Sequence, residues 1–282
     1  MIISIESAWD MQMRQEKIMR EKRKRNGLLA LIFLCALLMA VVPVNAGAKY
    51  QNQWVKNAKG EDTYYNAKGK KLTGMQKIGK RYFYFDSKGI QRTGWRKIKG
   101  DYYFFRLDTQ AKGYRIGSKT INGIKLAAGG KAVMNSYSKR KLPLLVKANE
   151  TLQSITNAKM TKTQKLRKAF DYTKSHLKSY NRGGFQNSST WDIFYAEIAF
   201  SSGRADCYSY AAYFAYLANA LGYKATAISS GGHGWTEIDG KIYDTNWAKA
   251  SSVDSYFAMS YDLSGVAGRP RYKTNKLYLK RV

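Results

Sequence analysis

The chain has few of the residues that carry covalent and metal chemistry. Its 282 residues include two cysteines and two histidines, and 19 acidic residues stand against 49 lysines and arginines. Because Cys35 lies in the amino-terminal leader, we expect Cys207 to be the one cysteine of the mature chain. An internal disulfide is then excluded, and one cysteine with two distant histidines is too small a ligand set for a metal site. We therefore expect no metal and no cofactor.

The leader has the three parts of an export signal. Basic residues at 20–25 precede an unbroken apolar run at 28–42, and the small-residue pattern Val44-Asn45-Ala46 follows. An apolar run of this length is short for a membrane span. We expect residues 1–46 to be a signal peptide cleaved near Ala46, with retention as an uncleaved anchor as the alternative. The mature protein should then be secreted.

After the leader the sequence repeats itself with a period of about 20 residues. Units begin at Trp54, Met75 and Trp95, and a degenerate fourth unit covers 117–130. Each unit has an alternating aromatic run that ends at a glycine turn, which is typical of a short hairpin. Such hairpins bury too little surface alone, so we expect residues 47–130 to form a stacked all-β array.

These units resemble the cell-wall-binding repeats of Gram-positive surface proteins, which include choline-binding and glucan-binding modules. The shared pattern is Gly-Trp-x-x-Ile-x-Gly-x-x-Tyr-Phe-Phe, although the tryptophan that usually heads the aromatic triplet is missing. The resemblance implies association with the cell wall through aromatic side chains. The candidate ligand-binding residues are Trp54, Tyr64, Tyr65, Tyr82, Tyr84, Trp95, Tyr102 and Tyr103.

The charge of the repeats bears on their ligand. Residues 47–148 hold 24 lysines and arginines against 5 acidic residues, whereas residues 149–282 hold 18 against 10. So basic a module repels a quaternary ammonium ion at long range, even though aromatic rings attract one at contact. We therefore expect an anionic wall polymer such as teichoic acid, or a glycan, with choline second. Nucleic acid also suits basic and aromatic residues, but export disfavours it. The purely structural alternative is that the aromatic residues form the hairpin core, which strand alternation requires for about half of them.

A polar segment at 131–148 that includes Pro143 is interpreted as a linker, and residues 149–282 as a second domain. Apolar spacing predicts a series of helices in this domain. They are expected at 149–157, 161–180, 191–200 and 207–221. Thr161 and Gln164 form a capping-box pattern, and Asp206 precedes the last helix as a cap.

A strand at 225–229 and a hairpin from His233 to Trp247 follow, and the Asp239-Gly240 turn fixes the hairpin register. Trp235 then lies opposite Asp244. Alternation places His233 and Asp244 on one face as diagonal neighbours, within reach of each other. This arrangement predicts Cys207 as nucleophile, His233 as general base and acid, and Asp244 as the residue that orients the imidazole. Asn246 is the alternative orienting residue, and His176 is expected at the surface.

The residues Gly203-x-x-x-Cys207, His233-x-Trp235 and Asp244-x-Asn246-Trp247 resemble the transglutaminase-like superfamily over about 160–250. The resemblance implies a papain-like α+β fold whose Cys-His-Asp triad forms a thioester with a protein or peptidoglycan-peptide substrate. Water would complete a protease, amidase or deamidase reaction, and an amine would complete crosslinking. Gly234 replaces the alanine usual in that family, a mild change, and Trp191 is a guess for an oxyanion donor. The alternative is a catalytically inactive wall-binding or adhesin protein.

Overall fold

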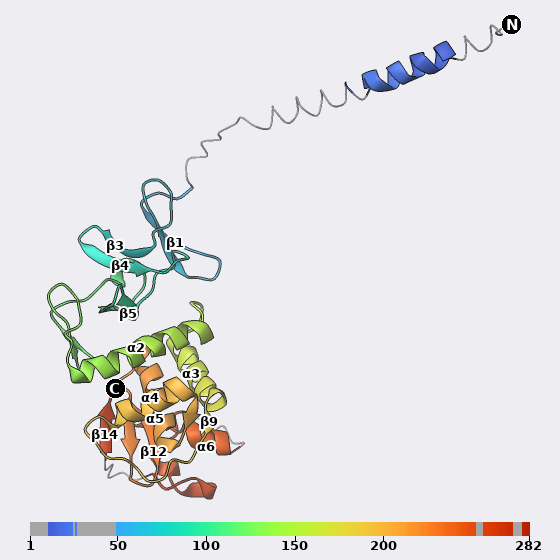
Figure 1. The fold of residues 1–282 in the computed structure, drawn as a ribbon. Helices are drawn as coiled ribbons and strands as arrows, with labels where there is room; N and C mark the ends of the chain where they lie inside the picture. The colour runs from blue at the N-terminus through green and yellow to red at the C-terminus, as the bar shows by residue number, and fades with distance from the viewer. Residues whose placement is uncertain (1–10, 25, 27–48, 252–255, 273–277) are drawn as a thin grey trace, which may run out of the picture. The chain divides into compact units, whose positions relative to one another are not determined.

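The computed structural model describes residues 11–24, 26, 49–251, 256–272 and 278–282 (Figure 1). The chain divides into two units, Met1–Lys49 and Tyr50–Val282. Residues 11–24 of the first unit form a helix. The apolar run and cleavage pattern of the predicted export signal lie outside the described residues, as does Cys35. Among the described helices, none has both the length and the apolar character needed to cross a bilayer.

The described repeats form four two-stranded hairpins, as their sequence period predicts. The strands are β1 (Gln53–Lys56), β2 (Asp62–Tyr65), β3 (Gly74–Ile78), β4 (Arg81–Phe85), β5 (Gly94–Ile98), β6 (Asp101–Phe105), β7 (Thr120–Ile121) and β8 (Ile124–Lys125). Glycine has a positive φ in each connecting turn, for example +90° at Gly100, where a side chain would be strained.

Backbone hydrogen bonds join each hairpin to the segment that follows the next hairpin. These bonds run from Gln91 N to Asp62 O, from Arg115 N to Tyr82 O and from Ala132 N to Tyr102 O, each 2.8 Å long. Aromatic contacts add to them, since the Trp54 ring packs 5.2 Å from Phe83 and 5.7 Å from Phe85 of the next unit. The units therefore stack as expected, and much of the aromatic content serves that stacking.

The segment expected as a linker is largely helical. Helix α2 (Ser136–Ile155) begins at the Asn135 cap, whose side chain accepts from Ser138 N. Pro143 lies inside this helix and removes one backbone donor. The helix forms nevertheless because its apolar residues are buried against other elements, which outweighs the lost hydrogen bond. The prediction of a linker over 131–148 was wrong for this reason.

The rest of the second unit is α+β. Its helices are α3 (Lys162–His176), α4 (Trp191–Ser202), α5 (Cys207–Ala220) and α6 (Thr245–Ala250). Its strands are β9 (Lys178–Ser179), β10 (Arg204–Ala205), β11 (Thr226–Ser229), β12 (Gly234–Ile238), β13 (Lys241–Tyr243) and β14 (Tyr278–Arg281). Among the described strands, β13, β12, β11 and β14 form an antiparallel sheet in that order.

Helix α5 is the centre of the core. Every residue from 208 to 218 is buried, because α2, α3, α4, α6, β11 and β12 all contact this helix. A helix that is apolar all round is typical of such a position. Its amino-terminal end, where Cys207 lies, is only half-buried. The fold therefore holds one end of a rigid helix at the surface.

Candidate functional site

Cys207 is the first residue of α5. Gly203 ends α4 in a left-handed conformation with φ of 66°, and Asp206 then caps α5 by accepting from Ser209 N at 2.8 Å. The first N–H groups of a helix lack intrahelical partners, and the helix dipole is positive there. A thiolate at this position is favoured, and the same N–H groups are suited to hold an oxyanion. The sulfur is a free thiol.

His233 lies immediately before β12 and faces Cys207. Its Nε2 is 2.6 Å from Asp244 Oδ2, and its ring also interacts electrostatically with the Cys207 side chain. The close approach of β12 to α5 depends on Gly234. A Cβ at Gly234 would lie 2.9 Å from Tyr208 Cδ1 and 3.1 Å from the Cys207 carbonyl oxygen. Glycine in place of the usual alanine, which we expected to be a mild change, is thus required by the packing at this point.

Asp244 is held by several donors. Its Oδ1 accepts from Trp247 N at 2.9 Å, and its Oδ2 accepts from the Tyr272 hydroxyl at 2.6 Å as well as facing His233. The residue is 1% exposed. Strand β13 ends at Tyr243, so Asp244 caps α6 instead of continuing a strand. The predicted hairpin register is correct through Thr236 and Tyr243, but the strand is shorter than expected.

The surroundings of His233 favour the imidazolium. Burial lowers the pKa of His233, but the charge and hydrogen bond of Asp244, with a smaller contribution from Cys207, outweigh burial and raise this pKa to about 10. The imidazole is therefore protonated at neutral pH. A protonated imidazole beside the sulfur stabilises a thiolate and can supply a proton to a leaving group.

Sequence reasoning missed Tyr272. This residue follows Asp244 by 28 positions, and no local motif marks it. Its ring lies 6.0 Å from that of His233 and 5.2 Å from that of Trp235. The Ser264 hydroxyl accepts from Tyr272 N at 2.6 Å and fixes the backbone there. Tyr272 thus positions the carboxylate from a segment beyond the resemblance.

The other candidates lie elsewhere. His176 is exposed and stacks on Tyr172 at 4.6 Å, as a surface histidine is expected to do. Asn246 lies on α6, and in the described part of the chain it is Asp244 that is hydrogen bonded to His233. Trp191 is buried against Phe185, and its indole N–H has no partner in the described part of the chain. None of these contacts assigns Trp191 to an oxyanion site.

The predicted ligand-binding aromatic residues divide between core and surface. Trp54, Tyr64, Tyr84 and Trp95 pack on other rings, and Trp95 is 1% exposed. Trp95 Nε1 donates to Asn122 Oδ1 at 2.9 Å. These contacts place Trp95 in the core, and its role as a ligand contact stays a prediction.

The other four rings, of which Tyr103 is buried, lie close to cations of the protein itself. Lys71 lies 5.9 Å from the Tyr65 ring and Lys97 lies 5.6 Å from the Tyr102 ring. Tyr82 and Tyr103 both face Arg115. The aromatic surface of the repeats is therefore already paired with positive charge.

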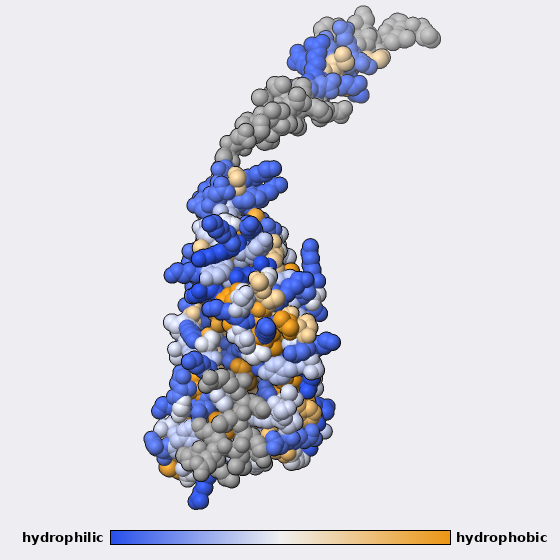
Figure 2. Space-filling model, turned by 90° about the vertical axis from the view of Figure 1, so that its left-hand side faces the viewer, coloured by the Kyte–Doolittle hydropathy of each residue, from blue (hydrophilic) through white to orange (hydrophobic). Residues whose placement is uncertain are grey.

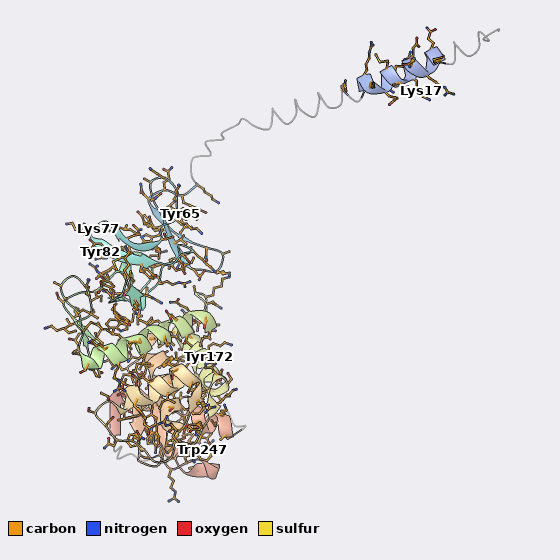
Figure 3. All side chains as sticks on the ribbon, viewed as in Figure 1. Lys17, Tyr65, Lys77, Tyr82, Tyr172 and Trp247 are labelled. Atoms are coloured by element: carbon orange, nitrogen blue, oxygen red, sulfur yellow. The ribbon has the colours of Figure 1, made fainter. Side chains whose placement is uncertain are left out.

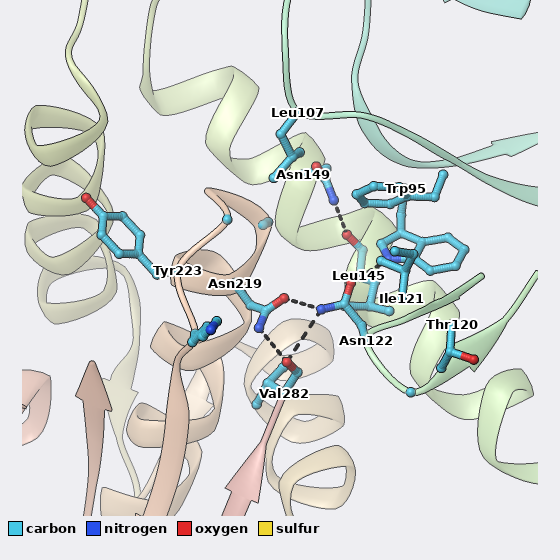
Figure 4. Close-up of a pocket in the computed structure, with 15 residues that line it drawn as sticks. Trp95, Leu107, Thr120, Ile121, Asn122, Leu145, Asn149, Asn219, Tyr223 and Val282 are labelled. Atoms are coloured by element: carbon cyan, nitrogen blue, oxygen red, sulfur yellow. Dashed lines mark hydrogen bonds between the residues drawn. The ribbon is translucent and has the colours of Figure 1, made fainter. Parts of the chain in front are cut away.

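A cavity of about 540 Å³ lies between the repeats and the carboxyl-terminal end of α5 (Figure 4). Its lining includes Trp95, Phe104, Asn122, Asn149, Asn219 and Tyr223. Asn122 and Asn219 are hydrogen bonded to each other across this junction. Figure 2 shows apolar surface gathered where the repeats meet the helices. Cys207 is at the opposite end of α5, so this cavity is separate from the thiol.

Comparison with known families identifies the repeats. A family model described as the choline-binding repeat matches residues 72–113, which confirms the prediction of wall-binding-type repeats over that segment. The match ends well before Cys207, so the transglutaminase-like prediction depends on the residues and geometry described above. No curated protein matches the chain.

Several solved structures are similar to part of the chain. Choline binding protein F from Streptococcus pneumoniae is 26% identical with a TM-score of 0.26, covering 30% of this chain and 28% of that one. The choline-binding domain of Spr1274 from Streptococcus pneumoniae is 22% identical with a TM-score of 0.27, covering 31% and 99%. Truncated alternansucrase from Leuconostoc mesenteroides is 28% identical with a TM-score of 0.21, covering 23% and 6%. The chain thus spans under a third of the length of choline binding protein F.

Proposed function

We propose that this protein is a wall-associated cysteine enzyme that forms a thioester on peptide or carboxamide substrates. The observation that carries the proposal is the 2.6 Å contact between His233 and Asp244, with the Cys207 side chain interacting with the same imidazole from a helix amino terminus. A nucleophile, a proton carrier and an orienting carboxylate in that order are the parts that acyl transfer requires.

The chemistry follows from these groups. The Cys207 thiolate attacks the carbonyl carbon, and the backbone N–H groups that begin α5 stabilise the developing oxyanion. As the C–N bond breaks, His233 gives its proton to the departing amine or ammonia, leaving a thioester. An acceptor then attacks this thioester while His233 takes the acceptor's proton and Cys207 leaves as the thiolate, which restores the starting imidazolium and thiolate. Asp244 orients the imidazole through its hydrogen bond to Nε2.

The acceptor decides the class of enzyme. Water gives a peptidase, amidase or deamidase, and a lysine or diamino-acid amine gives a crosslink. Water is favoured by its concentration, so an amine acceptor must be bound and oriented to compete. Incubating the protein with a glutaminyl peptide, with and without a labelled amine, and weighing the products by mass spectrometry separates the two outcomes.

The repeats supply the second half of the proposal. We infer that they hold the secreted protein at the cell wall, with an anionic polymer such as teichoic acid or a glycan as the first ligand class and choline as the second. The excess of basic side chains in the repeats supports the anionic class. Binding to walls stripped of teichoic acid that is as strong as binding to intact walls would count against it.

A binding protein without activity is the second candidate. The choline-binding repeat match favours it, because that match covers the repeats and not the Cys-His-Asp domain. In this reading the second domain is a structural or adhesive partner, and Cys207 is an ordinary half-buried thiol.

Alkylation of Cys207 by iodoacetamide across pH distinguishes the two candidates. We expect His233 to accelerate alkylation, because a protonated imidazole beside a sulfur favours the reactive thiolate. Replacing His233 by Ala should slow alkylation at pH 6 by about tenfold or more. His176→Ala is the matched control, since His176 is an exposed histidine outside the site, and its rate should be unchanged.

Equal rates for the wild type and His233→Ala would support the inactive binding protein.

The pH dependence of turnover offers a second check. Because the pKa of His233 is raised to about 10, the proton needed by the leaving group is present at neutral pH and is lost as pH rises through about 10. Activity should therefore fall above that pH.

A further inference from the structure

The second and third repeats enclose a cage of side chains around one positive charge. The guanidinium carbon of Arg115 lies 4.2 Å from the centre of the Tyr82 ring and 5.6 Å from that of Tyr103. Arg115 Nη1 also donates to the sulfur of Met75 at 3.6 Å. Figure 3 shows Tyr82 on the repeats, apart from the helical part of the unit. The cage is thus built from β3, β4 and β6.

Arg115 is fixed in this cage by its backbone and by a close neighbour. Its N–H donates to the Tyr82 carbonyl at 2.8 Å, and its backbone bridges to Phe105. A Cβ at Gly130 would lie 2.8 Å from Arg115 Nε, so only glycine lets the chain pass against this side chain. In the part of the chain that the structure describes, no carboxylate forms an ion pair with Arg115. Its charge therefore interacts mainly with the rings.

The neighbouring units do not repeat this cage. Strand pairing shows that Asp62 in the first unit and Tyr102 in the third unit are equivalent to Tyr82. Asp62 is buried and bonded to Lys56 at 2.8 Å, which leaves no aromatic ring at that position. Tyr102 pairs with Lys97, and Ala132 takes the place that Arg115 has beside Tyr82, so no guanidinium lies there. Among the described residues of the repeats, the Tyr82 cage is therefore the position at which rings from two repeats lie against one cation.

Aromatic rings at these distances around a cation are the chemistry that recognises quaternary ammonium ions. The choline-binding repeat match includes Met75, Tyr82 and Tyr103 but ends at residue 113, before Arg115. We propose that this cage is a quaternary-ammonium site that the chain keeps closed with its own Arg115, so that Arg115 excludes choline from the repeats. A guanidinium in the cage occupies the volume and the ring faces that a trimethylammonium group needs. It also repels any second cation.

Calorimetric titration of the purified protein with choline chloride at constant ionic strength tests this proposal. The wild type should bind choline at least about tenfold more weakly than Arg115→Ala, whose binding should saturate. Adding Tyr82→Ala to Arg115→Ala should abolish the gain. Arg81→Ala is the matched control, because the Arg81 guanidinium lies 4.2 Å from Tyr114, outside the cage, and its loss should create no choline site.

Two results would overturn the proposal. One is an Arg115→Ala protein that unfolds cooperatively like the wild type and yet gains no choline binding. The other is saturable choline binding by the wild type that Tyr82→Ala abolishes, and this second result is decisive even if Arg115→Ala fails to fold. Neither measurement depends on Cys207, so the outcome is independent of the proposed enzymatic activity.

Discussion

At the scale of single residues, the site depends on close contacts around one imidazole. Asp244 receives hydrogen bonds from Trp247 and Tyr272 while it faces His233. A buried carboxylate needs such donors, because it has lost the hydration that stabilises its charge. The contact between His233 and Cys207 depends in turn on how closely β12 approaches the start of α5, and Gly234 sets that approach.

Replacing Gly234 by Ala should therefore damage both stability and reactivity. The added methyl would lie 2.9 Å from the Tyr208 side chain and 3.0 Å from the Tyr208 Cα, and the backbone atoms cannot move aside cheaply. We expect a loss of about 1–3 kcal/mol in the free energy of unfolding, as overpacking usually costs. Cys207 alkylation should slow as the thiol moves away from His233. Urea unfolding and alkylation kinetics measure the two effects.

Gly232→Ala is the control for this substitution, since a Cβ at Gly232 has no atom within 4 Å. It should leave stability and alkylation unchanged. If both substitutions were equally mild, the close packing of β12 on α5 would not be what holds His233 against Cys207.

At the scale of elements, the turn between β12 and β13 decides which side chains share a face. Asp239 and Gly240 have φ values of 50° and 72°, as a type I′ turn requires. The turn was predictable because Asp-Gly is a local signal, and the observed pairing of Ile238 with Lys241 follows from it. The length of β13 was not predictable in the same way, since the Asp244 cap of α6 ends the strand.

Gly240→Ala tests the contribution of this turn. The position has no neighbour within 4 Å, so the substitution adds only backbone strain. We expect the free energy of unfolding to fall by about 1–2 kcal/mol, the cost of a left-handed conformation for alanine. Asp239→Asn should be nearly neutral, because asparagine tolerates positive φ. An equal loss in both variants, measured by urea unfolding, would show that the turn conformation is not the cause.

At the scale of the whole molecule, the repeats and the helical domain share one core. Trp95, Ile124 and Leu126 of the repeats belong to the same buried cluster as Leu145 of α2 and Phe214 of α5. The junction is tight: a Cβ at Gly94 would overlap the Asn149 side chain, 1.9 Å from its Oδ1. The repeats are therefore a structural part of the second unit as well as its proposed wall anchor (Figures 1 and 4).

Deleting residues 50–130 should accordingly destabilise the remaining chain. Loss of the Trp95 packing alone removes a contact of the kind that costs about 3–5 kcal/mol when a buried tryptophan is truncated. We expect a lower melting temperature and exposed apolar surface on α2. Deleting residues 1–49, a separate unit, is the control and should leave the melting temperature unchanged. A truncated domain as stable as the full chain would contradict the shared core.

The sequence by itself determined the features that depend on neighbouring residues. The 20-residue period, the glycine turns, the Asp206 and Thr161 caps and the Asp239-Gly240 register are all local, because turn and cap chemistry acts over a few positions. That is why the hairpins were predictable. It is also why His233 and Asp244 could be expected on one face, although Cys207 lies more than 20 residues earlier in the sequence.

Only the tertiary structure decided how distant segments meet. It brought Tyr272 onto Asp244, placed Arg115 in the Tyr82 cage and made the expected linker a core helix. Each of these depends on burial and charge between residues far apart in the chain, which no local pattern encodes. Tertiary burial overrode the polar composition at 136–141 and the proline at 143, since the apolar side chains of α2 gain more by packing than the helix loses.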